Sequence, residues 1–133
     1  MAGGKGNKLI QFTISILPRT KKNSQQIIMR KGRPVIVPSK AYKQYEKDSR
    51  YFMPKIETID YPVNIKTIYY MPTRRRVDLC NLHEALCDSL VHHGVIADDN
   101  CRIVVSMDGS RVEYSKDNPR TEVTIERVGE TNE

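Results

Sequence analysis

The chain has 133 residues, 38% of them hydrophobic, which fits one compact domain with a modest core and is short for two domains. Lys and Arg outnumber Asp and Glu by 22 to 16, so the formal net charge of +6 favours an anionic partner such as a nucleic acid. The N-terminal segment MAGGKGNK lacks the apolar stretch of a signal peptide, no apolar run approaches the roughly 20 residues of a membrane span, and the three cysteines form an odd set. We therefore expect a cytoplasmic protein with no membrane association.

The first predicted element is a strand. Residues 1–8 are glycine-rich and expected to be flexible, whereas Ile10, Phe12, Ile14 and Ile16 alternate with polar residues, the pattern of a strand with one buried face. The following segment, PRTKKNSQQ, is irregular and basic. Its cations, which include Lys21 and Lys22, can reach the phosphates of a nucleic acid or can belong to an ordinary solvated loop.

Residues 27–37 predict a short hairpin, because the apolar runs IIM and VIV flank RKGR. Gly32 can supply the positive φ that a tight turn needs. The predicted tip is cationic, and we expect Arg30, Lys31 and Arg33 to bind the phosphates of a nucleic acid.

A helix is predicted from about residue 40 to Phe52, with Ser39 as its N-cap. Tyr42 and Tyr45 lie near each other on it and either join a nucleic-acid surface or pack on the sheet. Much of the remaining helix surface is cationic, through Lys40, Lys43, Lys47 and Arg50. Of these, Lys40 and Lys43 are predicted to bind a nucleic acid.

A long strand over residues 61–71 precedes a turn and three consecutive arginines, Arg74, Arg75 and Arg76. Adjacent side chains cannot all point the same way, so we expect two of the three to reach a common phosphate track. The arginines therefore predict a phosphate-binding cluster directly before the first acid of the next segment.

The next element is a helix over residues 79–93, with Asp78 at its N-cap and Gly94 ending it. At about 100° per residue, one stripe of this helix is apolar and predicts the core face: Leu79, Leu82, Leu86 and Leu90. The other side is polar, with Asp78, Asn81, Glu84, Asp88 and His92. Glu84 and Asp88 are either site residues or ordinary solvated charges.

A third strip of this helix holds Cys80, Cys87 and Val91 and is too apolar to face water comfortably, so we expect it to meet a partner subunit. A structural zinc module is an alternative, because Cys80, His83 and Cys87 share a face that Cys101 or His92 could complete. The spacing lacks the usual turn-borne Cys-x-x-Cys pair. The adjacent His92 and His93 are not assigned a general-base role, because His93 falls with the core leucines and His92 lies near the helix end.

Asp98 and Asp99 follow the helix and precede a strand predicted over residues 101–107. Adjacent like charges are unfavourable unless a cation offsets them, and a metal ion does so economically. Neighbouring residues entering a strand point to opposite faces, so we expect Asp99 to join the site directly. Asp98 is expected to cap, to bind a basic side chain, or to reach the metal through a water molecule.

The C-terminal part predicts a loop or hairpin after Met107, a final strand over residues 121–125, and a flexible tail at residues 129–133. The predicted fold class is α+β, with a small mixed sheet of about four to five strands and two main helices, in one domain spanning residues 1–133.

The run Asp78-Leu79-x-Asn81-Leu82, followed by Ala85, Asp88, Leu90, Gly94-Val95 and Asp98-Asp99, resembles the RusA-type Holliday junction resolvases, a family common in phages and prophages. The resemblance extends more weakly to PRTKKNS and PSKAYKQYE. It implies a small α+β homodimer in the bacterial host cytoplasm. It also implies binding to four-way or other branched DNA, and nicking with Mg²⁺, or with Mn²⁺ in its place, through a cluster of aspartates.

Carried over by residue, Asp78 matches the first aspartate of the family's DLDN motif, and Asp99 matches its distal catalytic aspartate. The chain has DLCN instead, so Cys80 stands at the second aspartate, and a thiolate is a poor magnesium ligand. Glu84 stands where the family has a lysine. We expect Glu84, or Asp88 one turn later, to supply the missing oxygen ligand.

The expected activity is metal-assisted hydrolysis of phosphodiesters, which resolves four-way junctions during recombination and repair. The expected catalytic residues are Asp78, Glu84, Asp88 and Asp99, and the expected metal ligands are Asp78, Glu84, Asp98 and Asp99. Arg74 to Arg76 and Lys21 or Lys22 would neutralise charge on the phosphate. The alternative, suggested by Cys80, is a protein that binds junctions and does not cut them.

Overall fold

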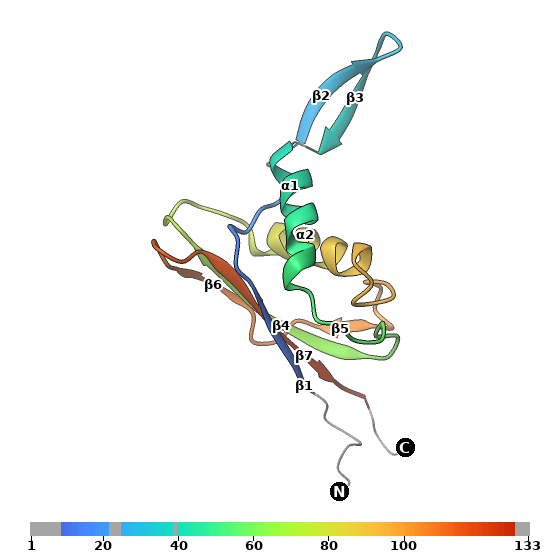
Figure 1. The fold of residues 1–133 in the computed structure, drawn as a ribbon, viewed down its shortest axis with the longest axis vertical. Coiled ribbons are helices and arrows are strands. Elements are labelled where there is room, and N and C mark those ends of the chain that lie inside the picture. The colour runs from blue at the N-terminus through green and yellow to red at the C-terminus, as the bar shows by residue number, and fades with distance from the viewer. Residues whose placement is uncertain (1–8, 22–24, 39, 130–133) are drawn as a thin grey trace, which may run out of the picture.

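The computed structural model describes residues 9–21, 25–38 and 40–129. Within them it contains a five-stranded mixed sheet, a separate two-stranded sheet and two α-helices, as the α+β prediction required (Figure 1). The larger sheet consists of β1 (Leu9–Ile14), β4 (Val63–Met71), β5 (Val104–Ser106), β6 (Arg111–Tyr114) and β7 (Arg120–Arg127). The predictions for residues 1–8, Lys22, Ser39 and residues 130–133 lie outside the described residues.

The sheet has the order β1-β7-β4-β5, and β6 also pairs with β4. β7 pairs antiparallel with both β1 and β4, whereas β5 and β6 run parallel to β4. The parallel pairing of β4 with β5 requires a crossover, and α2 (Leu79–His92) forms it. The helix that carries the predicted acids is therefore fixed on one face of the sheet.

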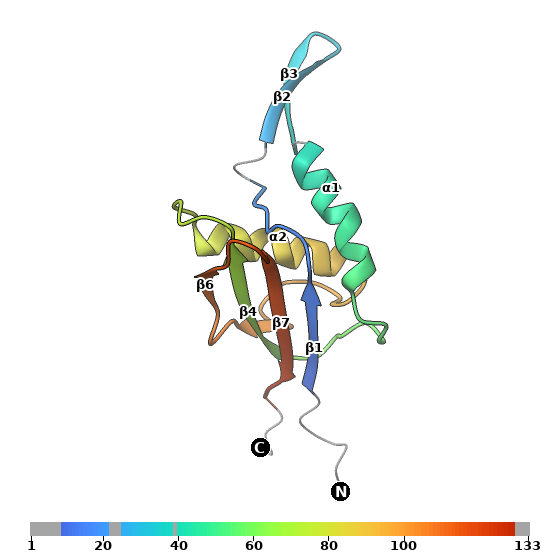
Figure 2. The ribbon, with the colours of Figure 1, turned by 60° about the vertical axis from the view of Figure 1, so that its left-hand side comes forward.

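Both helices lie on that same face, with α2 crossing the strands and α1 (Lys40–Ser49) packed beside it (Figure 2). The predicted leucine stripe of α2 faces the core, because Leu82, Leu86 and Leu90 are fully buried. They pack against the inward side chains of the strands, which include Ile65 and Val123. The apolar side chains that alternate along the strands and those that recur every turn of α2 thus form one hydrophobic core.

The two tyrosines of α1 are buried rather than presented to a nucleic acid. Tyr42 is 3% exposed and Tyr45 is 5% exposed, and both pack with Ala85 of α2. A buried hydrogen bond of 2.7 Å also joins the hydroxyls of Ser49 and Ser89. Of the two alternatives predicted for these tyrosines, packing is therefore the one observed, with α2 as the partner, and their side of α1 holds the two helices together. A one-turn 3-10 helix, η3 (Arg50–Phe52), continues α1 to the predicted end.

The predicted hairpin is present as β2 (Gln25–Arg30) and β3 (Arg33–Pro38). Its two-residue turn has positive φ at both Lys31 (52°) and Gly32 (77°), which is the geometry of a type I′ turn. The hairpin pairs only with itself among the described strands and projects beyond α1, away from the main sheet (Figure 1).

The strand predicted over residues 101–107 is shorter than expected. Residues 101–103 form turns, tied by bonds from the N–H groups of Ile103 and Val104 to the carbonyl of Asn100, and β5 begins only at Val104. Asp98 and Asp99 therefore lie in a loop and do not enter a strand directly. The segment after Met107, predicted as a loop or hairpin, supplies β6 as an additional strand of the sheet.

Candidate functional site

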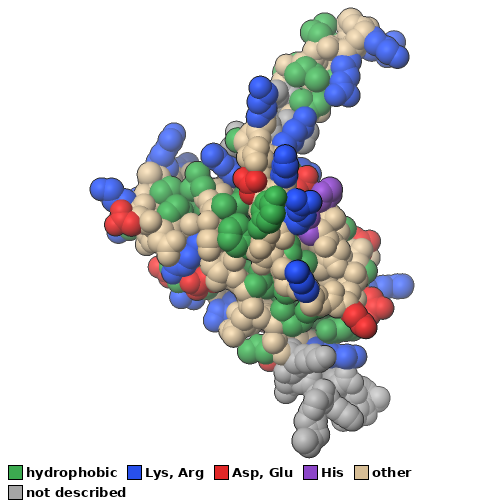
Figure 3. Space-filling model, viewed as in Figure 1, with side chains coloured by type: hydrophobic (Ala, Val, Ile, Leu, Met, Phe, Trp, Pro, Cys, Tyr) green, Lys and Arg blue, Asp and Glu red, His purple; other side chains and the backbone are tan. Residues whose placement is uncertain are grey.

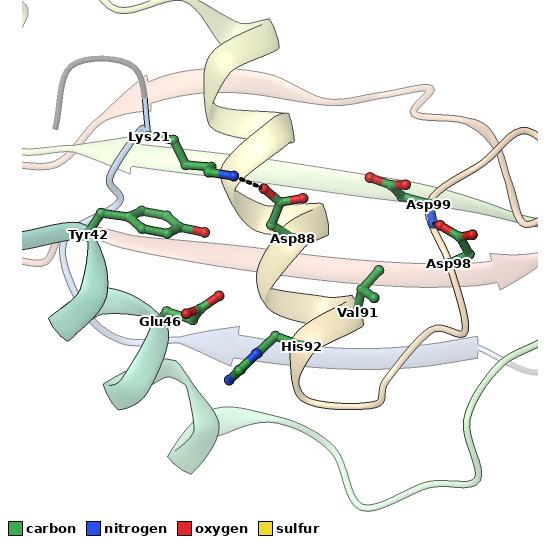
Figure 4. A pocket seen from close by; sticks show the side chains of 8 residues that line it. All are labelled: Lys21, Tyr42, Glu46, Asp88, Val91, His92, Asp98 and Asp99. Atoms are coloured by element: carbon green, nitrogen blue, oxygen red, sulfur yellow. Dashed lines mark hydrogen bonds and ion pairs between the residues drawn. The ribbon is translucent and has the colours of Figure 1, made fainter. Parts of the chain in front are cut away.

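An open pocket of about 520 Å³ lies between α1, α2 and the loop that follows α2 (Figure 4). Its lining residues come from segments far apart in the sequence: Lys21, Tyr42, Glu46, Asp88, Val91, His92, Asp98 and Asp99. Four carboxylates and one ammonium face this pocket, which leaves a formal excess of three negative charges in a chain that is positive overall. Such an excess favours the binding of a cation.

Lys21 and Asp88 form an ion pair in this pocket. The Lys21 ammonium donates to an Asp88 carboxylate oxygen at 2.7 Å, and each side chain is about one-third exposed (32% and 33%). The ammonium also lies 5.9 Å from the centre of the Tyr42 ring. The pKa of Lys21 is raised, chiefly by the hydrogen bond to Asp88. Lys21 therefore stays protonated and cannot act as a general base near neutral pH.

The loop after α2 presents two aspartates at the same pocket. Asp98 accepts a hydrogen bond from the backbone N–H of Asp99 at 2.7 Å and another from the Asn100 side chain at 3.1 Å. In Figure 4 the Asp99 carboxylate points toward Asp88, and the Asp98 carboxylate points away from it. The pKa of Asp99 is raised by partial burial, by the hydrogen bond with Asp98 and by the nearby charge of Asp88. Asp88 and Asp99 are thus the facing acids of the pocket.

The other two predicted acids lie outside this pocket. Asp78 occupies the N-cap of α2, as predicted, and accepts a hydrogen bond from the Asn81 side chain at 3.3 Å. It precedes Asp88 by ten residues on the same helix, which places it about 15 Å away along the helix axis. Glu84 is exposed, one turn before Asp88. A single chain therefore does not bring Asp78 into the pocket with Asp88 and Asp99.

Within the described ranges, no three or more His, Cys, Asp or Glu side chains are placed to hold a metal ion together. The described residues therefore give the zinc alternative no support. His83 hydrogen-bonds the Tyr69 hydroxyl at 2.7 Å, and burial raises the pKa of the Cys87 thiol to about 12. Magnesium needs fewer protein ligands, because one or two carboxylates, water and substrate phosphates commonly complete its coordination. The donor types of Asp88 and Asp99 fit that ion.

Cys87 also changes the proposed subunit contact. It is 7% exposed and buried within the chain itself, whereas Cys80 is exposed and Val91 is partly buried at the pocket. The strip is therefore not one continuous exposed surface, and the expected subunit contact stays a prediction. Cys80 and Val91 remain as the part of the strip that reaches the surface.

The three arginines before α2 separate into two groups. Arg75 and Arg76 line a second pocket of about 450 Å³ together with Arg19, whereas the Arg74 guanidinium lies 4.2 Å from the centre of the Tyr114 ring. Two of the three arginines therefore share one pocket, and their binding to a common phosphate track stays a prediction. The arginine pocket lies at the N-terminal end of α2, beside Asp78 rather than beside Asp99.

Basic side chains also run from the hairpin over α1 (Figure 3). Lys40, Lys43 and Lys47 are exposed on the side of α1 away from its buried tyrosines, and Arg30, Lys31 and Arg33 are exposed at the hairpin tip. Of the predicted DNA-binding cations that the structure describes, these residues and Arg74 to Arg76 are exposed, whereas Lys21 is only about one-third exposed and is paired with Asp88. No described helix is long and apolar enough to cross a bilayer.

Glu46 was not foreseen as a pocket residue. It lies on α1 one turn after Tyr42, on the side that faces α2, and it lines the pocket opposite Asp88. The signal was available, because Tyr42, Tyr45, Glu46 and Ser49 follow the i, i+3, i+4, i+7 spacing of one helix face. An acid on such a mostly buried face marks a site more often than an acid on a solvated face does.

The chain was compared with curated proteins and with models of protein families. The comparison with curated proteins gives no match. The family model described as Endodeoxyribonuclease RusA matches residues 16–126, a range that includes Lys21, Glu46, Asp78, Asp88 and Asp99. Because this match covers most of the 133 residues, the chain belongs to the RusA endodeoxyribonuclease family and is a nuclease.

Proposed function

We propose that this nuclease is a Mg²⁺-dependent, structure-selective enzyme that resolves four-way DNA junctions by paired hydrolysis of phosphodiesters, in recombination and repair within a bacterial host cytoplasm. The observation that carries the proposal is the acidic pocket, in which Asp88 and Asp99 face each other beside the Lys21 ammonium. Family membership supports the DNA junction as substrate.

Within one chain, Asp88 and Asp99 would hold the ion, with Asp98 reaching it through water. A bound Mg²⁺ supplies Lewis-acid polarisation of the phosphate and lowers the pKa of a water molecule, whereas Mn²⁺ can substitute because it accepts the same oxygen ligands. The carboxylate excess of the pocket repels a phosphate unless a cation is present, which gives DNA cleavage a requirement for the metal.

The basic residues have two roles in the proposed reaction. Lys21 exchanges Asp88 for a non-bridging oxygen of the scissile phosphate and stabilises the charge that develops there. Arg75 and Arg76 hold the flanking strand at the other end of α2, and Lys40 and Lys43 extend the phosphate track along α1. Most of these contacts are made to phosphates, so they do not distinguish one base from another.

A homodimer fits the same proposal, because two sites related by a twofold axis can cut opposing strands of a junction symmetrically. It also provides a place for Asp78. Since Asp78 is about 15 Å from Asp88 in its own chain, we propose that it completes the pocket of the partner subunit.

The test is cleavage of a labelled four-way junction over a range of Mg²⁺ concentrations. Asp88→Asn and Asp99→Asn should abolish nicking, whereas Glu84→Gln is the matched control, since it neutralises an acid on the same helix outside the pocket. Tight junction binding by the wild type with no nicking in Mg²⁺ or Mn²⁺ would establish the alternative, a protein that binds junctions without cutting them. A Glu84→Gln variant as inactive as Asp99→Asn would refute this assignment of the ligands.

A further inference from the structure

The β2–β3 hairpin has two features that phosphate binding alone does not explain. It is an isolated two-stranded sheet that projects beyond the body of the protein (Figures 1 and 2). Such a hairpin has little stability of its own in water and gains order when a partner covers it.

One face of the hairpin is apolar and exposed. Ile27 pairs with Ile36 across the strands and Met29 pairs with Pro34, so these four side chains share one face. Ile27, Met29 and Ile36 are 69%, 66% and 65% exposed, among the most exposed large apolar side chains of the described chain. Alternation in the strands explains why they share a face, but not why that face is apolar, because a solvated face normally carries polar residues.

The tip of the same hairpin is strongly cationic. Arg30 and Arg33 lie directly opposite each other at its end, and Lys31 lies between them in the turn. Like charges in directly opposed positions destabilise a strand pair unless an anion lies between them. Among the described residues, the ion pairs involve Lys21, Arg111 and Arg120, and none involves the tip.

The positive charge of the hairpin favours branched DNA over a second copy of the chain as its binding partner. An apolar face alone would suit a second copy of the chain, but a second hairpin brings three more cations and no anion to the assembly. A branched DNA offers both complements, because phosphates flank base pairs that are open or poorly stacked at the branch point. Ile, Met and Pro are among the side chains that proteins insert between bases. The exposed lysines of α1 continue from the hairpin toward the body (Figure 3).

We infer that the β2–β3 hairpin is a branch-reading arm: its tip cations hold phosphates while Ile27, Met29, Pro34 and Ile36 pack against unstacked bases at the centre of the junction. The inference rests on the proposed action on branched DNA and adds to it the element that distinguishes a junction from a duplex. Base contact of this kind needs no particular sequence, so the arm selects structure rather than sequence.

The experiment compares two triple variants in EDTA, where no cleavage occurs. Ile27→Thr/Met29→Thr/Ile36→Thr makes the face polar and keeps strand propensity, whereas Ile27→Val/Met29→Leu/Ile36→Val keeps it apolar. Dissociation constants are measured for a four-way junction and for a linear duplex, with 2-aminopurine at the branch point reporting unstacking. The polar variant should lose about tenfold or more of the junction preference, should keep its duplex affinity, and should no longer raise the 2-aminopurine fluorescence. The apolar variant should behave as the wild type.

Three outcomes would overturn the inference. The polar variant could keep both its junction preference and the fluorescence rise, or it could lose duplex and junction affinity equally. It could also halve in mass by light scattering, which would identify the face as a subunit contact. Since the substituted side chains are exposed and lie outside the core clusters, circular dichroism and the melting temperature should be unchanged. If the wild type cleaves junctions but the polar variant keeps its junction preference, only the inference about the hairpin is refuted. If the polar variant loses its junction preference but the wild type cleaves nothing in any metal, only the nuclease proposal is refuted.

Discussion

The ammonium of Lys21 and the carboxylate of Asp88 lie 2.7 Å apart, although 67 residues separate them in the sequence. Asp88 is also one of the two facing acids of the pocket, so the ion pair and the proposed metal site share a carboxylate. A cation that binds Asp88 must displace or share Lys21. In the proposed reaction, that competition would place a protonated amine beside the metal when a phosphate binds.

Removing the charge of Lys21 should slow cleavage more than it weakens binding. We expect Lys21→Gln to lower the rate of junction cleavage by about 10²–10³-fold, the typical loss when one donor to a developing anion is removed. Junction affinity in EDTA should change little, because one phosphate contact among many is lost. Single-turnover cleavage and gel-shift titration measure the two quantities.

Lys21→Arg is the matched control, because it keeps the positive charge while changing the shape of the donor. It should retain far more activity than Lys21→Gln. Equal rates for Lys21→Gln and the wild type would show that the ion pair with Asp88 is structural only.

The position of Asp78 predicts complementation between subunits. If Asp78 serves the pocket of the partner, a mixed dimer of Asp78→Asn and Asp99→Asn chains contains one pocket with both aspartates intact. We therefore expect each variant alone to be inactive and the mixture, after denaturation and joint refolding, to nick one strand of the junction. If both residues act within one chain, each pocket of the mixed dimer lacks one aspartate, and the mixture stays inactive.

Most of the fold was predictable because local patterns agreed with tertiary packing. The alternation at Ile10–Ile14 and the leucine spacing of α2 each encode a buried face, so β1 and α2 follow from periodicity alone. The pairing of both β5 and β6 with one edge of β4 was not predictable, because it depends on non-local register. β5 is short because Asn100 accepts backbone hydrogen bonds that hold residues 101–103 in turns.

The site was predictable only in part: the sequence identified its acids, but not which residues from distant segments lie beside them. The acids were identified by charge and by resemblance, but ten residues of helix separate Asp78 from Asp88 by about 15 Å, a distance that the sequence already implied. By contrast, the proximity of Lys21 to Asp88, and of Glu46 to both, depends on how α1 and the loop before the hairpin pack on α2. No local pattern contains that information.

The lysines of α1 should contribute to affinity through counterion release. We expect Lys40→Gln/Lys43→Gln to reduce the slope of log K against log salt by about 1.8, at about 0.9 per phosphate contact. Lys66→Gln/Lys116→Gln is the control, because both lysines are exposed and lie on β4 and in the loop before β7, away from α1. Fluorescence anisotropy of a labelled junction at several salt concentrations measures the slope. An equal loss in both variants would show that net charge alone, rather than the α1 stripe, sets the affinity.

His83 should make the stability of the fold depend on pH. Its Nδ1 lies 2.7 Å from the Tyr69 hydroxyl, and burial lowers its pKa below the ordinary value of 6.5. The unfolded chain therefore binds a proton more readily, and the free energy of unfolding should fall as the pH drops from above 6.5 through the folded pKa and then level off. Urea titrations between pH 5 and 8 measure this dependence. His83→Asn keeps an acceptor near the position of Nδ1 and cannot titrate, so its curve should be flatter over that window; identical curves for the variant and the wild type would contradict the assignment.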